Sequence, residues 1–184
     1  MTTEAQSPAA LAGAQAPQTW QLPGGERATV RHFRHDDAAA EERFFNGLSL
    51  DSRHQRFHIG LHRLSPALLK LLTEVDQHLH RAWVVELPLA EGSVVIADAR
   101  FMRDPARPAV AEFAIAVADD LQGRGLGRRL LAHLITDARR QGVHTLFGDV
   151  LAENRRMLAL AREFGMRLRA HPDAPQLVRA VHAL

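Results

Sequence analysis

The chain of 184 residues contains no cysteine and no tyrosine. Without cysteine it can form no disulfide bond, thiolate zinc site, iron–sulfur cluster or cysteine-linked intermediate. Without tyrosine it has no phenol that could serve as a general acid. Any reaction carried out by this chain must therefore use other side chains or the backbone.

Long apolar runs and a large net charge are also missing. No stretch approaches the roughly 18 apolar residues of a membrane helix, and the N-terminus lacks the basic and apolar regions of a signal peptide. We therefore expect a cytoplasmic protein that does not bind membranes. Lys and Arg total 23 against 21 Asp and Glu, a formal net charge of +2, which argues against nucleic acid as a partner.

The length predicts one compact domain. Ala, Gln, Pro, Ser and Thr dominate the N-terminal segment, which offers too little apolar surface to offset the entropy of ordering. We expect a flexible tail over residues 1–24 and a domain over residues 25–184.

The order of predicted elements indicates the fold class. Helical spacing of apolar residues predicts helices after Asp36-Asp37, after Gly125 and after Asn154, with short helices and loops over residues 49–76. Alternating patterns predict strands at 27–34, 81–88, 93–102, 109–117 and 144–151, and a weaker pair at 167–170 and 177–181. The three central strands should form an antiparallel meander. The whole predicts an α/β (α+β) fold with a central mixed, mostly antiparallel sheet flanked by helices.

A glycine-rich segment joins the strand at 109–117 to the following helix. Residues 122–128 are Gln-Gly-Arg-Gly-Leu-Gly-Arg, so backbone N–H groups at a helix start can approach an anion without obstruction by Cβ atoms. A dinucleotide fingerprint would need glycine in place of Arg128, and the Gly-Lys-Ser/Thr of a P-loop is absent. The pattern predicts a diphosphate cradle, with a simple tight turn as the alternative.

This segment resembles the Gln/Arg-X-X-Gly-X-Gly/Ala acetyl-CoA signature of the GCN5-related N-acetyltransferase (GNAT) family. More narrowly, AEFAIAVADDLQGRGLGRRLL and GDVLAENRRMLALAREFGM resemble the acetyltransferase domain of bacterial protein lysine acetyltransferases, which act on acyl-CoA synthetases. The resemblance extends less clearly over residues 25–184. It implies a GNAT-like fold and an acetyl-CoA-dependent N-acetyltransferase that uses acetyl-CoA as co-substrate and needs no metal.

The resemblance also implies which residues bind acetyl-CoA. Backbone amides of the glycine segment would bind the pyrophosphate, and the preceding strand would pair with the pantetheine arm. Arg124 and Arg128 would neutralise phosphate, although exposed arginines at a helix start, Arg129 included, also occur without any ligand. Asn154 would bind the pantetheine arm, cap its helix, or do both. The cofactor-binding residues expected on this basis are Phe113, Ile115, Val117, Gln122, Gly123, Arg124, Gly125, Leu126, Gly127, Arg128 and Asn154.

Glu112 is the expected catalytic residue. It lies in an otherwise apolar strand, on the face opposite Phe113, Ile115 and Val117. The alternative is an ion pair with an arginine of a neighbouring strand such as Arg100, because buried charges are normally paired. The resemblance implies that Glu112 is the general base that deprotonates the acceptor amine, while a strand amide, at Ile115, stabilises the oxyanion.

Two residues differ from those of the family that this sequence resembles, and three histidines form a spacing pattern. Many relatives carry a tyrosine as general acid where this chain has Ala161, so the CoA thiolate is expected to leave unaided or to take a proton from water. Asp98 replaces an apolar residue of the lysine-acetylating relatives, and we expect it at an edge or outward position. Three histidines are four residues apart, as metal ligands on a helix would be, but Gly60 makes a continuous helix doubtful and we expect no metal; they are His54, His58 and His62.

Three hypotheses about the function remain, two enzymes that differ in their acceptor and one non-enzyme. We expect a protein lysine as acceptor, because Arg53, Arg56 and Arg63 would repel a polycationic small amine and suit an acidic protein such as an acyl-CoA synthetase. An acetyltransferase for small amines is the second hypothesis. A catalytically silent acyl-CoA-binding sensor is the third, and Glu112 argues against it because binding alone needs no base.

Overall fold

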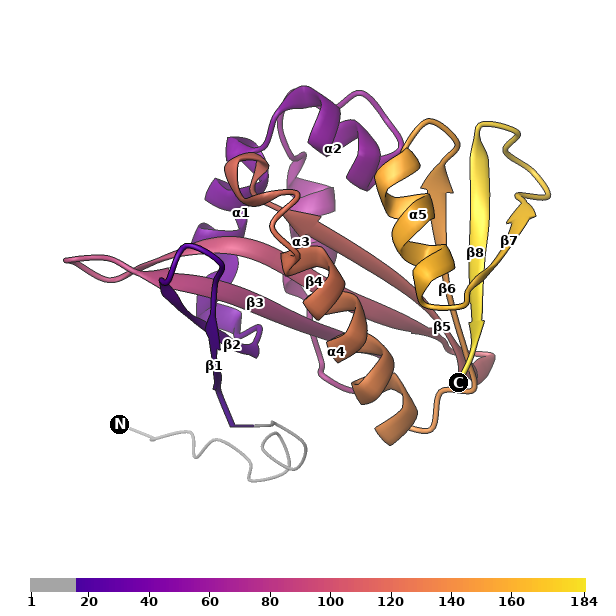
Figure 1. Cartoon of the computed structure of the whole chain (residues 1–184), viewed down its shortest axis with the longest axis horizontal. Helices are drawn as coiled ribbons and strands as arrows, with labels where there is room; N and C mark the ends of the chain where they lie inside the picture. The colour runs from indigo at the N-terminus through magenta and orange to yellow at the C-terminus, as the bar shows by residue number, and fades with distance from the viewer. Residues whose placement is uncertain (1–15) are drawn as a thin grey trace, which may run out of the picture.

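The computed structural model describes residues 16–184 and places a mixed sheet at the centre of the molecule (Figure 1). Within this part of the chain eight strands pair in the order β1-β2-β3-β4-β5-β6-β8-β7. Neighbouring strands are antiparallel except β5 and β6, which are parallel. The strands are β1 (Gln18–Gln21), β2 (Arg27–His32), β3 (His80–Pro88), β4 (Ser93–Asp104), β5 (Arg107–Val117), β6 (Thr145–Leu151), β7 (Arg167–Ala170) and β8 (Leu177–Ala183).

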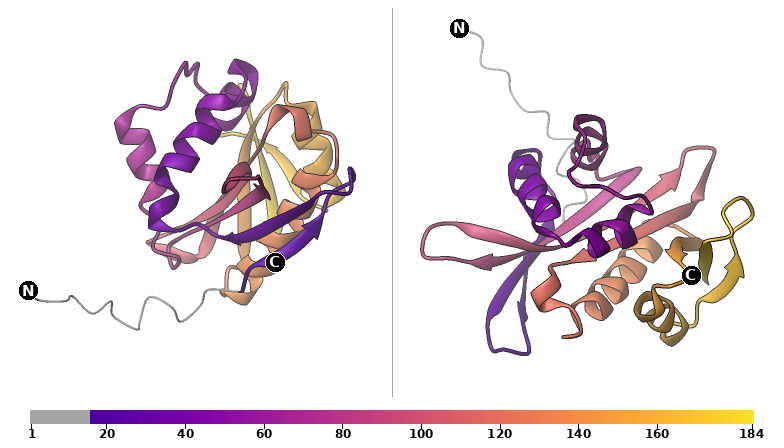
Figure 2. Two further views of the ribbon diagram at one scale, coloured as in Figure 1. Left: turned by 90° about the vertical axis from the view of Figure 1, so that its left-hand side faces the viewer. Right: turned by 90° about the horizontal axis from the view of Figure 1, so that it is seen from above.

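Helices cover both faces of this sheet. The first three helices pack on one face, and α4 and α5 pack on the other (Figure 2). No helix within residues 16–184 combines the length and the apolar character needed to cross a membrane. The helices are α1 (Ala38–Gly47), α2 (Leu50–Phe57), α3 (Pro66–Thr73), α4 (Leu126–Arg140) and α5 (Arg155–Glu163), with 3-10 turns η2 (His35–Asp37) and η3 (Asp119–Leu121).

Two apolar layers form the core because alternate side chains of each strand point to opposite faces. Trp83, Phe101 and Leu134 belong to the layer under α4 and α5, whereas Phe45 and Val84 belong to the layer under α1 to α3. The predicted meander is confirmed as β3-β4-β5, and the predicted helix after Gly125 is confirmed as α4. The strands predicted as a weak pair are β7 and β8.

The N-terminal boundary differs from the prediction. Of the tail expected over residues 1–24, positions 1–15 lie outside the described residues, but Gln18–Gln21 forms β1. Trp20 is 8% exposed and Leu22 is 7% exposed. The Arg129 guanidinium stacks over the Trp20 ring at 4.4 Å from its centroid. The sequence around Trp20 and Leu22 is polar, so it did not indicate a strand. The contacts that bury these two residues come from β2 and α4, which are distant in the chain.

Asp98 also lies in a position that the sequence did not predict. The expectation of an edge or outward position is wrong, because β4 is an inner strand and Asp98 is fully buried. The Arg100 guanidinium donates to both carboxylate oxygens of Asp98, at 2.9 and 2.6 Å, and also binds Glu41 of α1. A carboxylate can be buried here because an arginine two residues away on the same face compensates its charge.

The parallel pair β5–β6 separates soon after it forms. Pairing covers only Val110, Ala111 and Glu112 of β5, although β6 remains paired with β8 as far as Leu151. At the point of separation Gly148 faces the ring of Phe113, and a Cβ atom on residue 148 would lie 2.7 Å from that ring. A glycine is therefore required for the two strands to diverge with Phe113 between them.

Candidate active site

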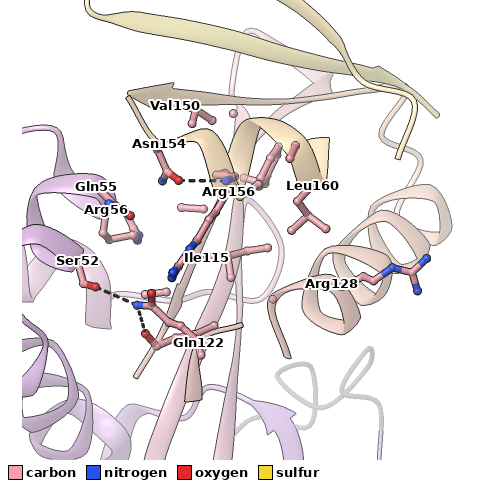
Figure 3. Close-up of a pocket in the computed structure, with 18 of the residues that line it drawn as sticks. Ser52, Gln55, Arg56, Ile115, Gln122, Arg128, Val150, Asn154, Arg156 and Leu160 are labelled. Carbon is pink, nitrogen blue, oxygen red and sulfur yellow. Dashed lines mark hydrogen bonds between the residues drawn. The ribbon is translucent and has the colours of Figure 1, made fainter. Parts of the chain in front are cut away.

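A cavity of about 600 Å³ occupies the gap between the diverging strands. Its walls are β5, β6, α2, α5 and the glycine segment that precedes α4. In Figure 3, Ser52, Gln55 and Arg56 of α2 face Asn154 and Arg156 across this cavity. The site therefore combines residues from three separate parts of the chain, 48–58, 112–128 and 148–163.

Unpaired backbone groups of β5 line the cavity. Ala118 N–H donates to Ile96 O of β4 at 2.9 Å, and alternate residues of a strand direct their amides to opposite edges. By this register the amides of Ile115 and Val117 point away from β4, to the edge that β6 has left, whereas the Phe113 amide, also expected to bind the ligand, lies beside the last paired residues of β5 and β6, Glu112 and Phe147. A ligand in extended conformation can pair with this edge as an additional strand.

The glycine segment lies at one end of the same cavity. Gly123 and Gly125 have φ angles of 74° and 82°, a backbone region that residues with side chains rarely adopt. Gly125 is the N-cap of α4 and offers no side chain to the N–H groups of the first helical turn. Glycines thus make the turn, as the simpler alternative requires, and also leave an open helix N-terminus suited to an anion.

Gln122 has a role in the structure that the sequence did not indicate. Its side-chain amide donates to Ser52 Oγ at 2.9 Å and to Val117 O at 3.1 Å (Figure 3). Asp119 in turn accepts from the hydroxyls of Ser49 and Ser52 at 2.7 and 2.6 Å. These bonds fix α2 against the end of β5 and so hold the two walls of the cavity together.

The arginines next to the glycine segment differ in their surroundings. Arg128 donates to Glu163 at 2.6 Å, and its guanidinium points away from the α2 wall (Figure 3). Arg129 donates to Gln21 O at 2.7 Å and belongs to the β1 contact rather than to the cavity. Arg124 is exposed. Arg156 of α5, which the sequence analysis missed, extends across the cavity toward Gln122 (Figure 3).

Asn154 and Leu126 take the positions that their helix starts require. The Asn154 side-chain oxygen accepts from Met157 N at 3.0 Å, so the predicted capping role is confirmed. Its amide nitrogen remains a donor at the cavity wall, which leaves the ligand-binding role as a prediction. Leu126 is 3% exposed and packs in the core, so only its backbone can meet a ligand.

Glu112 lies in the cavity on the α2 side of β5. Arg100 is paired with Asp98 and Glu41, so the ion pair considered between Arg100 and Glu112 is not formed. Glu112 is solvent-accessible at the cavity, but partial loss of surrounding water raises its pKa, and the negative charge of Asp149 acts in the same direction against the opposing charges of Arg56 and Arg179. A carboxylate with a raised pKa is better matched to accepting a proton near neutral pH.

Asp149 of β6 lines the cavity beside Glu112 and forms ion pairs with other residues. Arg179 of β8 donates to both of its carboxylate oxygens, at 2.8 and 2.7 Å, and His171 Nε2 lies 3.2 Å from one of them. The sequence analysis did not identify this cluster, because its members are brought together only by the β6–β8 pairing.

Arg53 of the α2 region is placed differently from the prediction, whereas the histidines are not on one continuous helix, as expected. Arg53 is buried and donates to His62 O at 2.5 Å, so it supports the loop and does not form a basic surface. Helix α2 ends at Phe57, and His58 adopts a left-handed conformation with φ 60°. The three histidines therefore do not align on one helix. Within residues 16–184 no group of three or more metal-binding side chains comes together.

Ala161, the position that carries tyrosine in many relatives, is fully buried in the core under α5. The cavity wall at this helix is formed instead by Met157 and Leu160. No hydroxyl of α5 is thus available to a leaving thiolate.

The chain matches known proteins over most of its length. The family model described as Acetyltransferase (GNAT) family matches residues 48–166. Acetyltransferase PA5475 of Pseudomonas aeruginosa is 33% identical over 152 residues, covering 83% of this chain and 81% of that protein. Acetyltransferase Pat of Mycolicibacterium smegmatis is 38% identical over 129 residues, covering 67% of this chain but only 37% of that protein. The chain thus spans little more than a third of that relative.

Two further matches are a solved structure and a relative that aligns over a shorter segment. The solved GNAT domain of S. lividans PAT superposes with a TM-score of 0.80 at 28% identity, covering 91% of this chain and 97% of that one. A relative from Salmonella typhimurium named [Ribosomal protein bS18]-alanine N-acetyltransferase is 49% identical over 53 residues, covering 29% of this chain and 36% of that protein.

Proposed function

Because the chain belongs to the GNAT acetyltransferase family, we propose that it transfers the acetyl group of acetyl-CoA to a protein amine, with a lysine side chain as the acceptor. The observation that carries this proposal is the divergence of β5 from β6. It leaves a row of strand amides unpaired between an open helix N-terminus and the carboxylate of Glu112.

Each part of the cavity fits one part of acetyl-CoA. The N–H groups of residues 122–128 would bind the pyrophosphate, and Arg156 adds positive charge on the opposite wall. The Val117 amide would pair with the pantetheine arm, the Asn154 amide would donate to the arm, and the Ile115 amide would lie at the thioester. This arrangement directs the thioester toward Ile115 and Glu112.

The reaction requires a base and an oxyanion donor, and the site supplies both. Glu112 takes a proton from the ammonium of the acceptor, directly or through water, and the free amine attacks the thioester carbonyl carbon. The Ile115 N–H donates to the oxygen that becomes negatively charged. The C–S bond then breaks as the amide forms, and the proton that the attacking nitrogen loses reaches the departing thiolate through water, because no tyrosine is present.

A protein acceptor is supported by the comparisons and by the charges near the cavity. The name of the Salmonella relative specifies a ribosomal protein as acceptor. Arg56 lines the cavity and Arg63 is exposed on the adjoining loop, and both would disfavour a polycationic small amine. An acidic surface of an acyl-CoA synthetase remains the partner that we propose.

The test is acetyl transfer itself. Protein incubated with acetyl-CoA and a panel of lysine peptides, candidate acyl-CoA synthetases, polyamines and aminoglycosides is analysed by mass spectrometry. Acetylation of a protein lysine is expected. Transfer only to small amines would contradict the acceptor, and no transfer to any amine would contradict the reaction.

The proposed binding of CoA at the glycine segment is tested with a matched pair of glycine variants. Gly125→Glu is expected to abolish CoA binding in calorimetry, because it obstructs the loop and adds negative charge. Gly142→Glu is the control, since Gly142 has a similar φ of 76° but lies past the opposite end of α4. Unchanged CoA affinity in folded Gly125→Glu protein would remove the loop from the site.

A further inference from the structure

Arg56 is a cavity residue whose hydrogen-bonding groups have no protein partner. Its Nε atom is buried without an acceptor, and neither terminal nitrogen donates to any residue of the described chain 16–184. Two other arginines of the sheet are paired with carboxylates: Arg81 with Asp137, and Arg179 with Asp149. A buried donor left unpaired is costly, so an unpaired arginine at a cavity wall calls for an explanation.

The protein holds the Arg56 side chain in place without neutralising it by contact. The guanidinium lies 4.9 Å from the ring centroid of Phe57 and 5.8 Å from that of Phe45. The buried carboxylates nearby are engaged by Arg100, as described above. Burial lowers the pKa of Arg56 to about 10, and Arg100 acts in the same direction, so the side chain is still a cation at neutral pH.

Arg56 belongs to the acceptor half of the cavity. It shares the α2 side of β5 with Glu112, and each group influences the charge of the other. The glycine segment, where the phosphates are expected, follows the far end of β5 at Val117. An anion that reaches Arg56 therefore arrives with the acceptor rather than with the pyrophosphate.

We propose that Arg56 binds a carboxylate of the acceptor, so that this enzyme acts on amines that carry a carboxylate close to the reacting nitrogen. The inference rests on the proposed function and specifies its substrate class. A guanidinium presents two parallel N–H groups that match the two oxygens of a carboxylate. The carboxylate has two possible sources, an acidic residue beside a protein lysine or the α-carboxylate of a free amino acid.

The experiment measures binding, so it does not depend on turnover. Protein saturated with CoA is titrated in a calorimeter with two matched pairs of probes. The first pair is the blocked peptides Asp-Lys-Asp and Asn-Lys-Asn, and the second is free lysine and lysine amide. In one pair the member with the carboxylate is expected to bind about 10- to 100-fold more tightly, as for a charge-assisted hydrogen-bonded pair. The pair that discriminates identifies the source.

Variants connect this preference to Arg56. Arg56→Gln is expected to remove it, and Arg56→Lys, which retains the charge without the planar fork, is expected to retain only part of it. The lysine variant also provides the test if the glutamine variant does not fold. Arg27→Gln is the matched control, because it removes the same charge from an exposed position on β2 outside the cavity and should retain the full preference.

Two results overturn the assignment. One is equal or undetectable binding of both members in both pairs. The other is a full preference retained by folded Arg56→Gln or Arg56→Lys protein. Absence of acetyl transfer, by contrast, would contradict the proposed reaction and leave the binding result standing.

Discussion

Replacing Glu112 by glutamine tests the proposed base with almost no change in shape. The cavity, the unpaired edge of β5 and the glycine segment all remain, but residue 112 can no longer accept a proton. CoA affinity measured by calorimetry is therefore expected to be nearly unchanged, while acetyl transfer slows.

The size of the effect follows from the acceptor and from the surroundings of Glu112. A lysine amine with a pKa of about 10.4 is about three units from neutrality, so only about one molecule in a thousand is free, equivalent to about 4 kcal/mol. A positioned base offsets much of this and typically contributes about 10²- to 10⁴-fold. We expect Glu112→Gln to lower kcat by a factor in this range at neutral pH.

The pH profile separates a base from a structural residue. Wild-type activity should rise with pH through the pKa of Glu112, which burial and Asp149 raise above the usual value for glutamate. Activity of Glu112→Gln should instead follow the free amine, rising about tenfold per pH unit up to about pH 10. The two rates should therefore converge at high pH.

The measurement is initial rate against pH, followed by thiol release, with Asp120→Asn as control. Asp120 is an exposed carboxylate outside the cavity, so its loss changes the net charge by the same amount. Equal wild-type and Glu112→Gln rates at pH 7, or profiles of the same shape, would refute Glu112 as the base.

Three further predictions concern the framework of the site. Gly148→Ala forces its new Cβ against the Phe113 ring; we expect a loss of about 1–3 kcal/mol in urea unfolding and weaker CoA binding, and an unchanged Kd would contradict this. Arg100→Met leaves two buried carboxylates without their cation, so unfolding free energy should fall by about 3–5 kcal/mol; an unchanged urea midpoint would count against it. Burial alone would raise the pKa of Asp119, but hydrogen bonds from α2 outweigh it and hold this pKa below its usual value. The stability that Asp119 contributes should be present above about pH 4 and decline on further acidification, so Asp119→Asn should be less stable than wild type at pH 6, by a margin that narrows as the pH falls below about 4.

Local patterns in the sequence determined the order of elements and the two ends of the site. The meander β3-β4-β5 follows from period-two alternation, and α4 from the recurrence of leucines at helical spacing. The glycine segment and the opposite faces of Glu112 and Phe113 follow from turn chemistry and strand geometry. All of these depend on residues only a few positions apart, which is why a single sequence predicts them.

Contacts between distant segments decided what lies at the site and how it is held. The separation of β5 from β6 depends on how far two strands pair, and the ion pair between Arg100 of β4 and Glu41 depends on α1 packing against the sheet. Composition could not show that Arg53 binds a loop carbonyl whereas Arg56 lines the cavity, because both belong to one basic stretch. Charge compensation and strand separation are properties of neighbours in space, and the tertiary structure alone specifies which residues become neighbours.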